Sequence, residues 1–429
     1  MGFRTNRGNR AHPLQGRRLF IPRMSTVGSE MIAAAFQSLG IAAEVLPPSD
    51  EETLSLAARF TTGEECLPQR ITLGDFLKII LQKNFDPYEN AFFLPTSSGP
   101  CRFGQYAPFL RKILRELNYP QSLVFSPTSS NGYGSIGSSL FRFYRTAWRA
   151  VVASDILRKL QLMIRPYEKY SGETDTVQKN ALAELCTILA DDSLSLKKQL
   201  SRLICSLEKI RDQFLGIRLA TERGIKPLIG IVGEIFLRLN SFSNQNIVRK
   251  IESLGAEVWM ADMSEWIWYT NLDQQRKLLD RGRKISVSMM GTRLKKWFQE
   301  QDEDALLRPF RHLFKEREEP PVPTLLQYSM PYLPAHMALG EMTLNTGKAI
   351  AYYHAGCDGV IDVSPFTCMN GIVTEAVYPK VSHDHADIPI RIFYFDGVPF
   401  DLECDLEIFF EQVKSFKNNK KNRISVSSS

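Results

Sequence analysis

Short apolar runs alternate with longer amphipathic stretches in the first third of the chain. The runs predicted to be strands lie at residues 18–22, 42–46, 91–94 and 122–125. Apolar residues at helical spacing predict helices at 29–39 and 103–117. Strands that alternate with helices of this length are typical of a parallel, doubly wound sheet. We therefore expect a first Rossmann-like α/β domain over residues 17–137.

The pattern changes between residues 138 and 224, where apolar residues recur at helical spacing and few strand or turn signals interrupt them. Leu182, Leu185 and Ile188 are one such series. This periodicity predicts a helical segment that bridges or covers two domains.

The strand–helix pattern then returns. A strand at 227–234, a helix at 244–254 and a strand at 257–260 repeat the layout of the opening segment, which indicates an internal structural repeat without close sequence repetition. We expect a second α/β domain over 225–330 and a C-terminal α/β segment over 331–416. The elements predicted in that last segment are a helix at 335–354, strands at 359–363 and 390–395, and a helix at 402–416. The predicted fold class is α/β, with two or more Rossmann-like parallel-sheet domains and a helical insertion between them.

Composition and charge narrow the class of protein. The 429 residues are about 44% hydrophobic and 23% charged, which is ordinary for a globular protein. No run of eighteen apolar residues predicts a membrane span, so we expect no membrane partner. Much of the net charge of +6 lies near the two ends, and we expect a disordered basic arm at 1–16 and a disordered basic tail at 417–429. No nucleic-acid-binding motif accompanies these charges, so nucleic acid is not an expected partner, although attraction of acidic cofactors stays open.

The first twenty residues contain five arginines and no apolar core, which is not the pattern of a secretory leader. Seven cysteines in such a chain predict a reducing, cytoplasmic setting, where cysteines are ligands, nucleophiles or buried apolar residues instead of disulfides.

Cys66, Cys101 and Cys368 share a distinctive local setting. Each lies in a junction rich in glycine and proline just before a predicted helix, and the last two follow a predicted strand directly. A helix N-terminus favours the thiolate, which is the form that binds iron or zinc. The carboxyl ends of different strands converge on one crevice in a doubly wound sheet, so three distant cysteines can meet there. Spacing alone leaves open that they are unrelated turn cysteines, because no CxxC motif is present.

The other cysteines have different surroundings. Cys186 and Cys205 lie in apolar-periodic helices and are predicted to be small buried residues. Cys357 precedes a strand, which favours a structural role over that of a fourth ligand. Cys404, at the start of the last helix, is predicted to be a packing residue.

Three further segments are weaker candidates for chemistry. Glu234 follows the strand at 227–234 and is either a site residue or a helix cap. His383-Asp-His385 has metal-ligand residue types, but we expect it to lie in a solvated loop. The glycine-rich stretch 126–139 is a candidate lid.

The blocks around these residues resemble a known family. "GEECLP" at 63–68, "SSGPCRFGQY" at 97–106, "IGIVGEIFLRLN" at 229–240 and "CDGVIDVSPFTCMNG" at 357–371 resemble the D-component of 2-hydroxyglutaryl-CoA dehydratase. They are more similar still to the acyl-CoA dehydratase activase-related proteins.

This resemblance implies Rossmann-like domains around a [4Fe–4S] cluster, or a double-cubane variant of it, held by Cys66, Cys101 and Cys368. It implies an ATP-hydrolysing activase with an actin/Hsp70-like fold as electron donor, a homo- or heterodimer with a related subunit, and an anaerobic setting. In the family, one low-potential electron reduces the thioester carbonyl of a 2-hydroxyacyl-CoA, and the ketyl radical that results expels hydroxide.

The sequence departs from the family pattern at two points. The phosphate-binding motifs of the activase are absent, so this chain would accept the electron. Asn370 stands where relatives often carry proline. The function expected is that of an activase-dependent dehydratase or reductase component acting on an acyl-CoA or other small substrate, with Glu234 as a catalytic candidate. A non-catalytic electron-relay or assembly subunit, and a zinc-bound or metal-free α/β binding protein, remain as alternatives.

Overall fold

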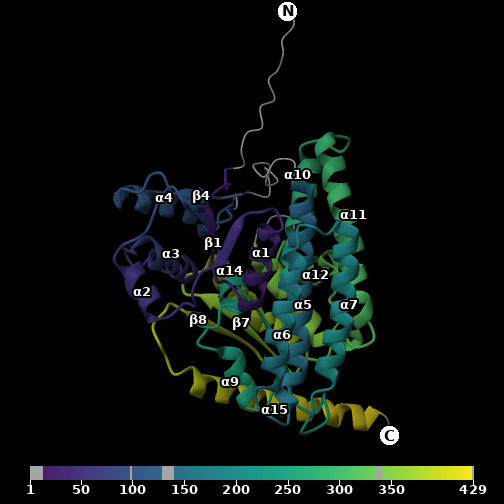
Figure 1. Ribbon diagram of the computed structural model, residues 1–429. Coiled ribbons are helices and arrows are strands. Elements are labelled where there is room, and N and C mark those ends of the chain that lie inside the picture. The colour runs from purple at the N-terminus through teal and green to yellow at the C-terminus, as the bar shows by residue number, and fades with distance from the viewer. Residues whose placement is uncertain (1–12, 97–98, 128–139, 335–339, 428–429) are drawn as a thin grey trace, which may run out of the picture.

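Two parallel four-stranded sheets flanked by helices make up the protein (Figure 1). The computed structural model describes residues 13–96, 99–127, 140–334 and 340–427. The predicted α/β, Rossmann-like class with a helical segment between two sheets is confirmed. The basic arm up to residue 12 and most of the candidate lid, residues 128–139, lie outside the described residues.

The first sheet has the strand order β2-β1-β3-β4, and each neighbouring pair is parallel. Its strands form where short apolar runs bury alternate or successive side chains between helical layers. They are β1 (Arg18–Ile21), β2 (Ala42–Val45), β3 (Asn90–Phe93) and β4 (Leu123–Phe125). The helices that accompany them are α1 (Thr26–Gln37), α2 (Glu51–Ala58), α3 (Leu67–Ile80), the short 3-10 helix η1 (Arg102–Gln105) and α4 (Tyr106–Glu116).

The second sheet repeats the topology of the first. Its order is β6-β5-β7-β8, so the first, second, third and fourth strands of each half occupy the same places. The internal repeat suggested by the sequence therefore exists at the level of strand order. The strands are β5 (Leu228–Gly233), β6 (Glu257–Met260), β7 (Gly359–Pro365) and β8 (Ile390–Phe395). The helices are α8 (Ile235–Leu239), α9 (Ile247–Ser253), α13 (Glu341–His354), α14 (Met369–Asp384) and α15 (Leu402–Ser427).

The predicted segments 225–330 and 331–416 form one domain and not two, because β5 and β6 share a sheet with β7 and β8. A long helical connection between β6 and β7 obscured this in the sequence. It consists of α10 (Met263–Asp280), α11 (Val287–Leu307), the 3-10 turns η4 (Arg308–Phe310) and η5 (Lys315–Arg317), and α12 (Val322–Ser329).

Three long helices follow the first sheet, and α11 from the second half lies beside them (Figure 1). They are α5 (Leu140–Ile164), α6 (Glu173–Ala190) and α7 (Leu196–Leu215), with the 3-10 turn η3 (Arg165–Tyr167) between the first two. Their apolar faces form one core, against which Cys186 packs. Cys205, predicted to be buried, is exposed, because it lies on the outer face of α7 while Leu203 and Leu207 face the core.

The C-terminal segment also differs from its prediction. Instead of ending at a disordered tail from residue 417, α15 continues as a helix to Ser427. Lys417 donates a 2.5 Å hydrogen bond to the carbonyl of Lys226, and the Lys420 ammonium donates to the carbonyl of Gly356 at 2.7 Å. These contacts hold the basic end of the helix against the second domain. None of the described helices is long and apolar enough to cross a membrane.

The two halves touch near the carboxyl ends of their strands. Leu67 and Ile71 of α3 belong to the same apolar core as residues of β5, β7 and β8. The Arg70 guanidinium donates to the carbonyl of Asp396 at 2.8 Å, and the Asn240 amide donates to the carbonyl of Arg23 at 2.9 Å. The start of α3 is thereby placed beside the second sheet.

Candidate metal centre

Each of the three candidate cysteines is the residue that immediately precedes a helix. Cys66 caps α3, Cys101 caps η1 and Cys368 caps α14, all with extended backbone. Cys101 follows β3 and Cys368 follows β7, which are the equivalent third strands of the two sheets. At Cys66 and Cys368 the side chain makes no cap hydrogen bond, although backbone amides, of Gln69 at the first and of Gly371 and Asn370 at the second, lower the pKa of the thiol.

Cys66 and Cys101 come from different loops of the first half and interact electrostatically. Desolvation raises the pKa of the Cys66 thiol, and negative charge on Glu234 and on Cys101 raises it further. The Arg102 side chain joins the two loops by donating to the carbonyl of Glu64 at 2.7 Å. Cys101 therefore lies near enough to Cys66 to affect the pKa of its thiol.

Cys368 joins this group through two glutamates of the second half. Burial raises the pKa of Cys368 to about 12, and the charges of Glu234 and Glu341 add to that effect. The same two carboxyl groups raise the pKa of Cys101, after partial desolvation. The structure thus brings residues of both halves, Cys66, Cys101, Cys368 and Glu234, into one electrostatic neighbourhood.

Tyr106 is a site residue that the sequence reasoning missed. Its hydroxyl lies 2.7 Å from the Sγ of Cys66, and burial raises the pKa of the phenol well above its usual value. Because Tyr106 begins α4, one turn after Cys101, the η1–α4 segment positions groups beside two cysteines at once. Its only sequence signal is its place at the end of the "SSGPCRFGQY" block.

Glu234 both caps a helix and faces the cysteines. Its carboxylate accepts hydrogen bonds from the amides of Phe236 and Leu237, at 3.1 and 2.9 Å, and so begins α8. The preceding Gly233 has a φ of 118°, and a Cβ there would lie 2.1 Å from the carbonyl oxygen of Val363, so glycine is required for this turn. The two alternatives left by the sequence, cap and site residue, are therefore compatible.

A second carboxyl group, Glu341, lies beside Glu234. It begins α13 and accepts a 3.0 Å hydrogen bond from the amide of Ile235. Burial and then the negative charge of Glu234 raise the pKa of Glu341 well above its usual value, and burial also raises the pKa of Glu234. Sequence reasoning missed Glu341, because only the packing of α13 against β5 brings it here.

Two buried amides near these carboxyl groups have unused hydrogen-bonding capacity. The Oδ1 of Asn345 accepts from the amide of Gly233 at 3.3 Å, but its Nδ2 has no partner among the described residues. The Oδ1 of Asn370, two residues after Cys368, is likewise unpaired within them. Unsatisfied buried polar atoms are costly, so a site that takes a polar ligand is a physical reason for their presence.

The thiols are not arranged around a single ion. Among the described residues no group of three or more His, Cys, Asp or Glu side chains is placed to hold one metal ion. The ligands of a zinc site converge on one atom. An iron–sulfur cluster differs, because each thiolate binds its own iron at a corner of the cluster. Three thiols at helix starts, of which Cys66 and Cys368 are half-buried and Cys101 is exposed, fit such a group chemically.

The remaining sequence candidates lie elsewhere. Cys357 is buried in an apolar cluster with Tyr352, which agrees with a structural role. Cys404, predicted to pack, is exposed in the first turn of α15. His383 lies at the end of α14 instead of in a loop, although it is solvent-exposed as expected and pairs with Asp387.

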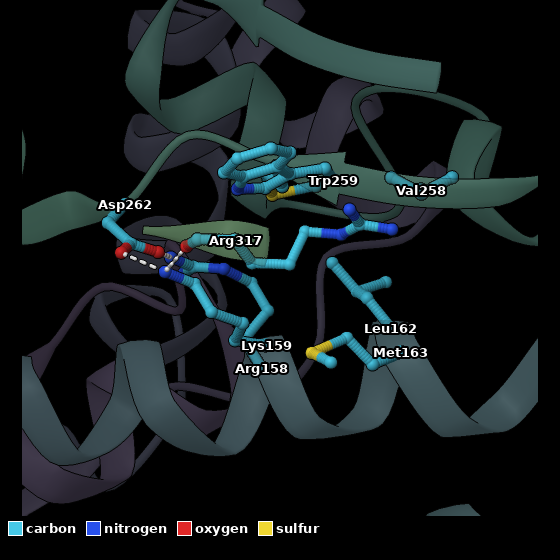
Figure 2. Close-up of a pocket in the computed structure, with 9 residues that line it drawn as sticks. Arg158, Lys159, Leu162, Met163, Val258, Trp259, Asp262 and Arg317 are labelled. Atoms are coloured by element: carbon cyan, nitrogen blue, oxygen red, sulfur yellow. Dashed lines mark hydrogen bonds and ion pairs between the residues drawn. The ribbon is translucent and has the colours of Figure 1, made fainter. Parts of the chain in front are cut away.

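A charged pocket lies between α5 and β6, away from the cysteines (Figure 2). Its lysine, Lys159, binds Asp262 at 2.9 Å and Glu319 at 3.0 Å, and Arg317 stacks over Trp259 and pairs with a buried glutamate. Since these charges are compensated by protein groups, the pocket serves to join the helical segment to the second sheet.

Comparison with known proteins adds no assignment, since neither a protein-family model nor a curated protein sequence matches this chain.

Proposed function

We propose that the chain is an iron–sulfur protein in which Cys66, Cys101 and Cys368 hold a [4Fe–4S] cluster. The observation that carries this proposal is the shared neighbourhood of three helix-capping cysteines from two sheets. Thiols with raised pKa values are poor nucleophiles, so as free groups these three have little chemistry at neutral pH. Iron would supply the positive charge that stabilises their thiolate forms.

The resemblance stated above suggests what such a cluster does. With three protein ligands, it would offer an open position and one-electron chemistry to a small substrate such as an acyl-CoA, with an ATP-dependent activase as electron donor. Glu341, whose pKa is raised by burial, would serve as a proton donor at the site, and Glu234 would cap α8 beside it. Tyr106 would orient the Cys66 sulfur through its hydroxyl.

Anaerobic purification with iron and sulfide analysis tests the cluster. We expect a coloured protein with about four iron and four sulfide per chain. Cys101→Ala should lose that iron, whereas Cys186→Ala should keep it, because Cys186 packs in the helical core. A colourless, iron-free anaerobic preparation, or equal iron loss in both variants, would contradict the proposal.

An electron-relay or assembly subunit is the second candidate function. The two functions separate in a reaction with a co-purified ATP-hydrolysing partner. A catalytic subunit should consume candidate 2-hydroxyacyl-CoA thioesters when ATP is added. A relay subunit should be reduced under the same conditions without turning them over.

A further inference from the structure

The end of the α10–α11 hairpin carries large apolar side chains that nothing in the described part of the chain covers. Ile285 is 96% exposed and Val287 88%, far more than the apolar side chains of a typical protein surface. We call this surface the apolar tip. It consists of Leu279, Ile285, Val287, Met290, Leu294 and Trp297. In Figure 1 the hairpin end projects at the top of the molecule, beyond the neighbouring helices.

The apolar tip lies within a strongly basic segment. Residues 276–297 contain eight lysines and arginines and one acidic residue, Asp280. Arg281, Arg283, Lys284 and Arg293 are exposed, and none of them forms an ion pair with another described residue. A surface that is both apolar and cationic needs a partner that is both apolar and anionic.

We propose that the apolar tip inserts into the surface of a membrane that contains anionic phospholipids. Apolar side chains that enter the headgroup region, combined with lysines and arginines at the lipid phosphates, are the two signals that together give stable attachment to a membrane surface. Trp297, near the base of the tip, has the residue type enriched at membrane interfaces. This attachment needs no spanning helix, and it departs from the sequence-based expectation of no membrane partner.

The distribution of exposure favours a lipid surface over other anionic partners. The exposed fraction of the apolar side chains is greatest at the connection between α10 and α11 and falls along α11 to 52% at Trp297. This distribution is expected if the end of the hairpin enters the lipid layer first. Val287, Met290, Leu294 and Trp297 follow one face of α11, but Ile285 in the connection and Leu279 in α10 lie outside that seam, so a single partner helix packed along α11 would not cover the whole tip. The phosphates of a nucleic acid would bind the lysines and arginines, but they would leave the apolar side chains of Ile285 and Val287 exposed.

Vesicle sedimentation with the full chain tests the proposal. We expect binding to vesicles of phosphatidylcholine with phosphatidylglycerol, at least tenfold weaker binding to phosphatidylcholine alone, and weakening by salt. Ile285→Ser with Val287→Ser should reduce binding at least tenfold, as should Arg283→Glu with Lys284→Glu. Lys197→Glu with Lys198→Glu, an equal charge change at exposed positions of α7, should bind like the unmodified chain.

Insertion is tested with brominated lipids, which quench tryptophan fluorescence by contact. We expect quenching that Trp297→Phe removes, since the other four tryptophans lie in the body of the protein. The proposal is overturned if vesicles are not bound, if neutral and anionic vesicles bind equally, or if the tip variants bind like the unmodified chain. It is also overturned if duplex DNA or an acidic polypeptide binds as tightly as anionic vesicles, or if the tip substitutions change only self-association.

Discussion

Buried carboxyl groups of this chain acquire different charges because their neighbours differ. Burial alone would raise the pKa of Glu319, but the ammonium groups of Lys159 and Lys348 overcome that effect and lower it to about 2. At Asp75 burial dominates, and hydrogen bonds from the hydroxyl groups of Ser49 and Thr53 only partly offset it, so its pKa rises to about 6. At the candidate metal centre burial raises the pKa of both Glu234 and Glu341, and the charge of Glu234 adds to the effect at Glu341.

Asp75 predicts a pH dependence of stability. Between its ordinary pKa of 3.8 and about 6, the folded protein keeps a proton that the unfolded chain has lost, so stability should fall as pH rises through this window. The shift corresponds to about 3 kcal/mol. Asp75→Asn removes the ionisable group, and its unfolding free energy, measured with urea from pH 4 to pH 8, should decline by about 3 kcal/mol less than that of the unmodified chain, in which Asp262 and Glu303 also have raised pKa values. An identical decline in the variant would contradict the assignment to Asp75.

At the scale of elements, buried ion pairs fix the long helices to one another. The carboxylate of Asp302 on α11 is fully buried and binds two arginines of α5, Arg145 at 2.6 Å and Arg149 at 3.0 Å. Two residues along the same helix, Asp304 is half-exposed and pairs with Arg308 and Arg311 at the surface. The two aspartates provide a matched comparison of buried and surface pairing.

Asp302→Ala should lower the unfolding free energy by about 3–5 kcal/mol, because it leaves the buried guanidinium of Arg149 without its carboxylate. Asp304→Ala should change it by less than about 1 kcal/mol, since solvent screens the exposed pairs. Chemical denaturation of both variants measures the difference. Equal losses would show that α11 is not anchored through Asp302.

At the scale of the whole molecule, the sequence predicted local structure better than the relations between distant segments. The strands were found because each is a short apolar run bounded by turns. The union of β5–β8 into one sheet was missed, because α10–α12 separate β6 from β7 along the chain. Glu341 and Tyr106 were missed for the same reason, since only tertiary packing places them beside Glu234 and Cys66.

Helix α3 is the element that couples the two sheets, and its residues divide between two cores. Ile71 is fully buried in the core shared with β5, β7 and β8, whereas Ile80, also fully buried, lies in the core of the first sheet alone. Truncating either to alanine should cost about 2–5 kcal/mol. Only the first substitution weakens the contact between the halves.

Hydrogen exchange followed by mass spectrometry distinguishes the two variants. In the unmodified chain we expect β3 and β7 to open with the same free energy, as parts of one cooperative unit. Ile80→Ala should lower protection of both strands together, because the halves stay coupled. Ile71→Ala should separate them, so that the two strands exchange with different opening free energies. If β3 and β7 already exchange independently in the unmodified chain, α3 does not couple the sheets, and Cys66 would not be held in a fixed relation to Cys368.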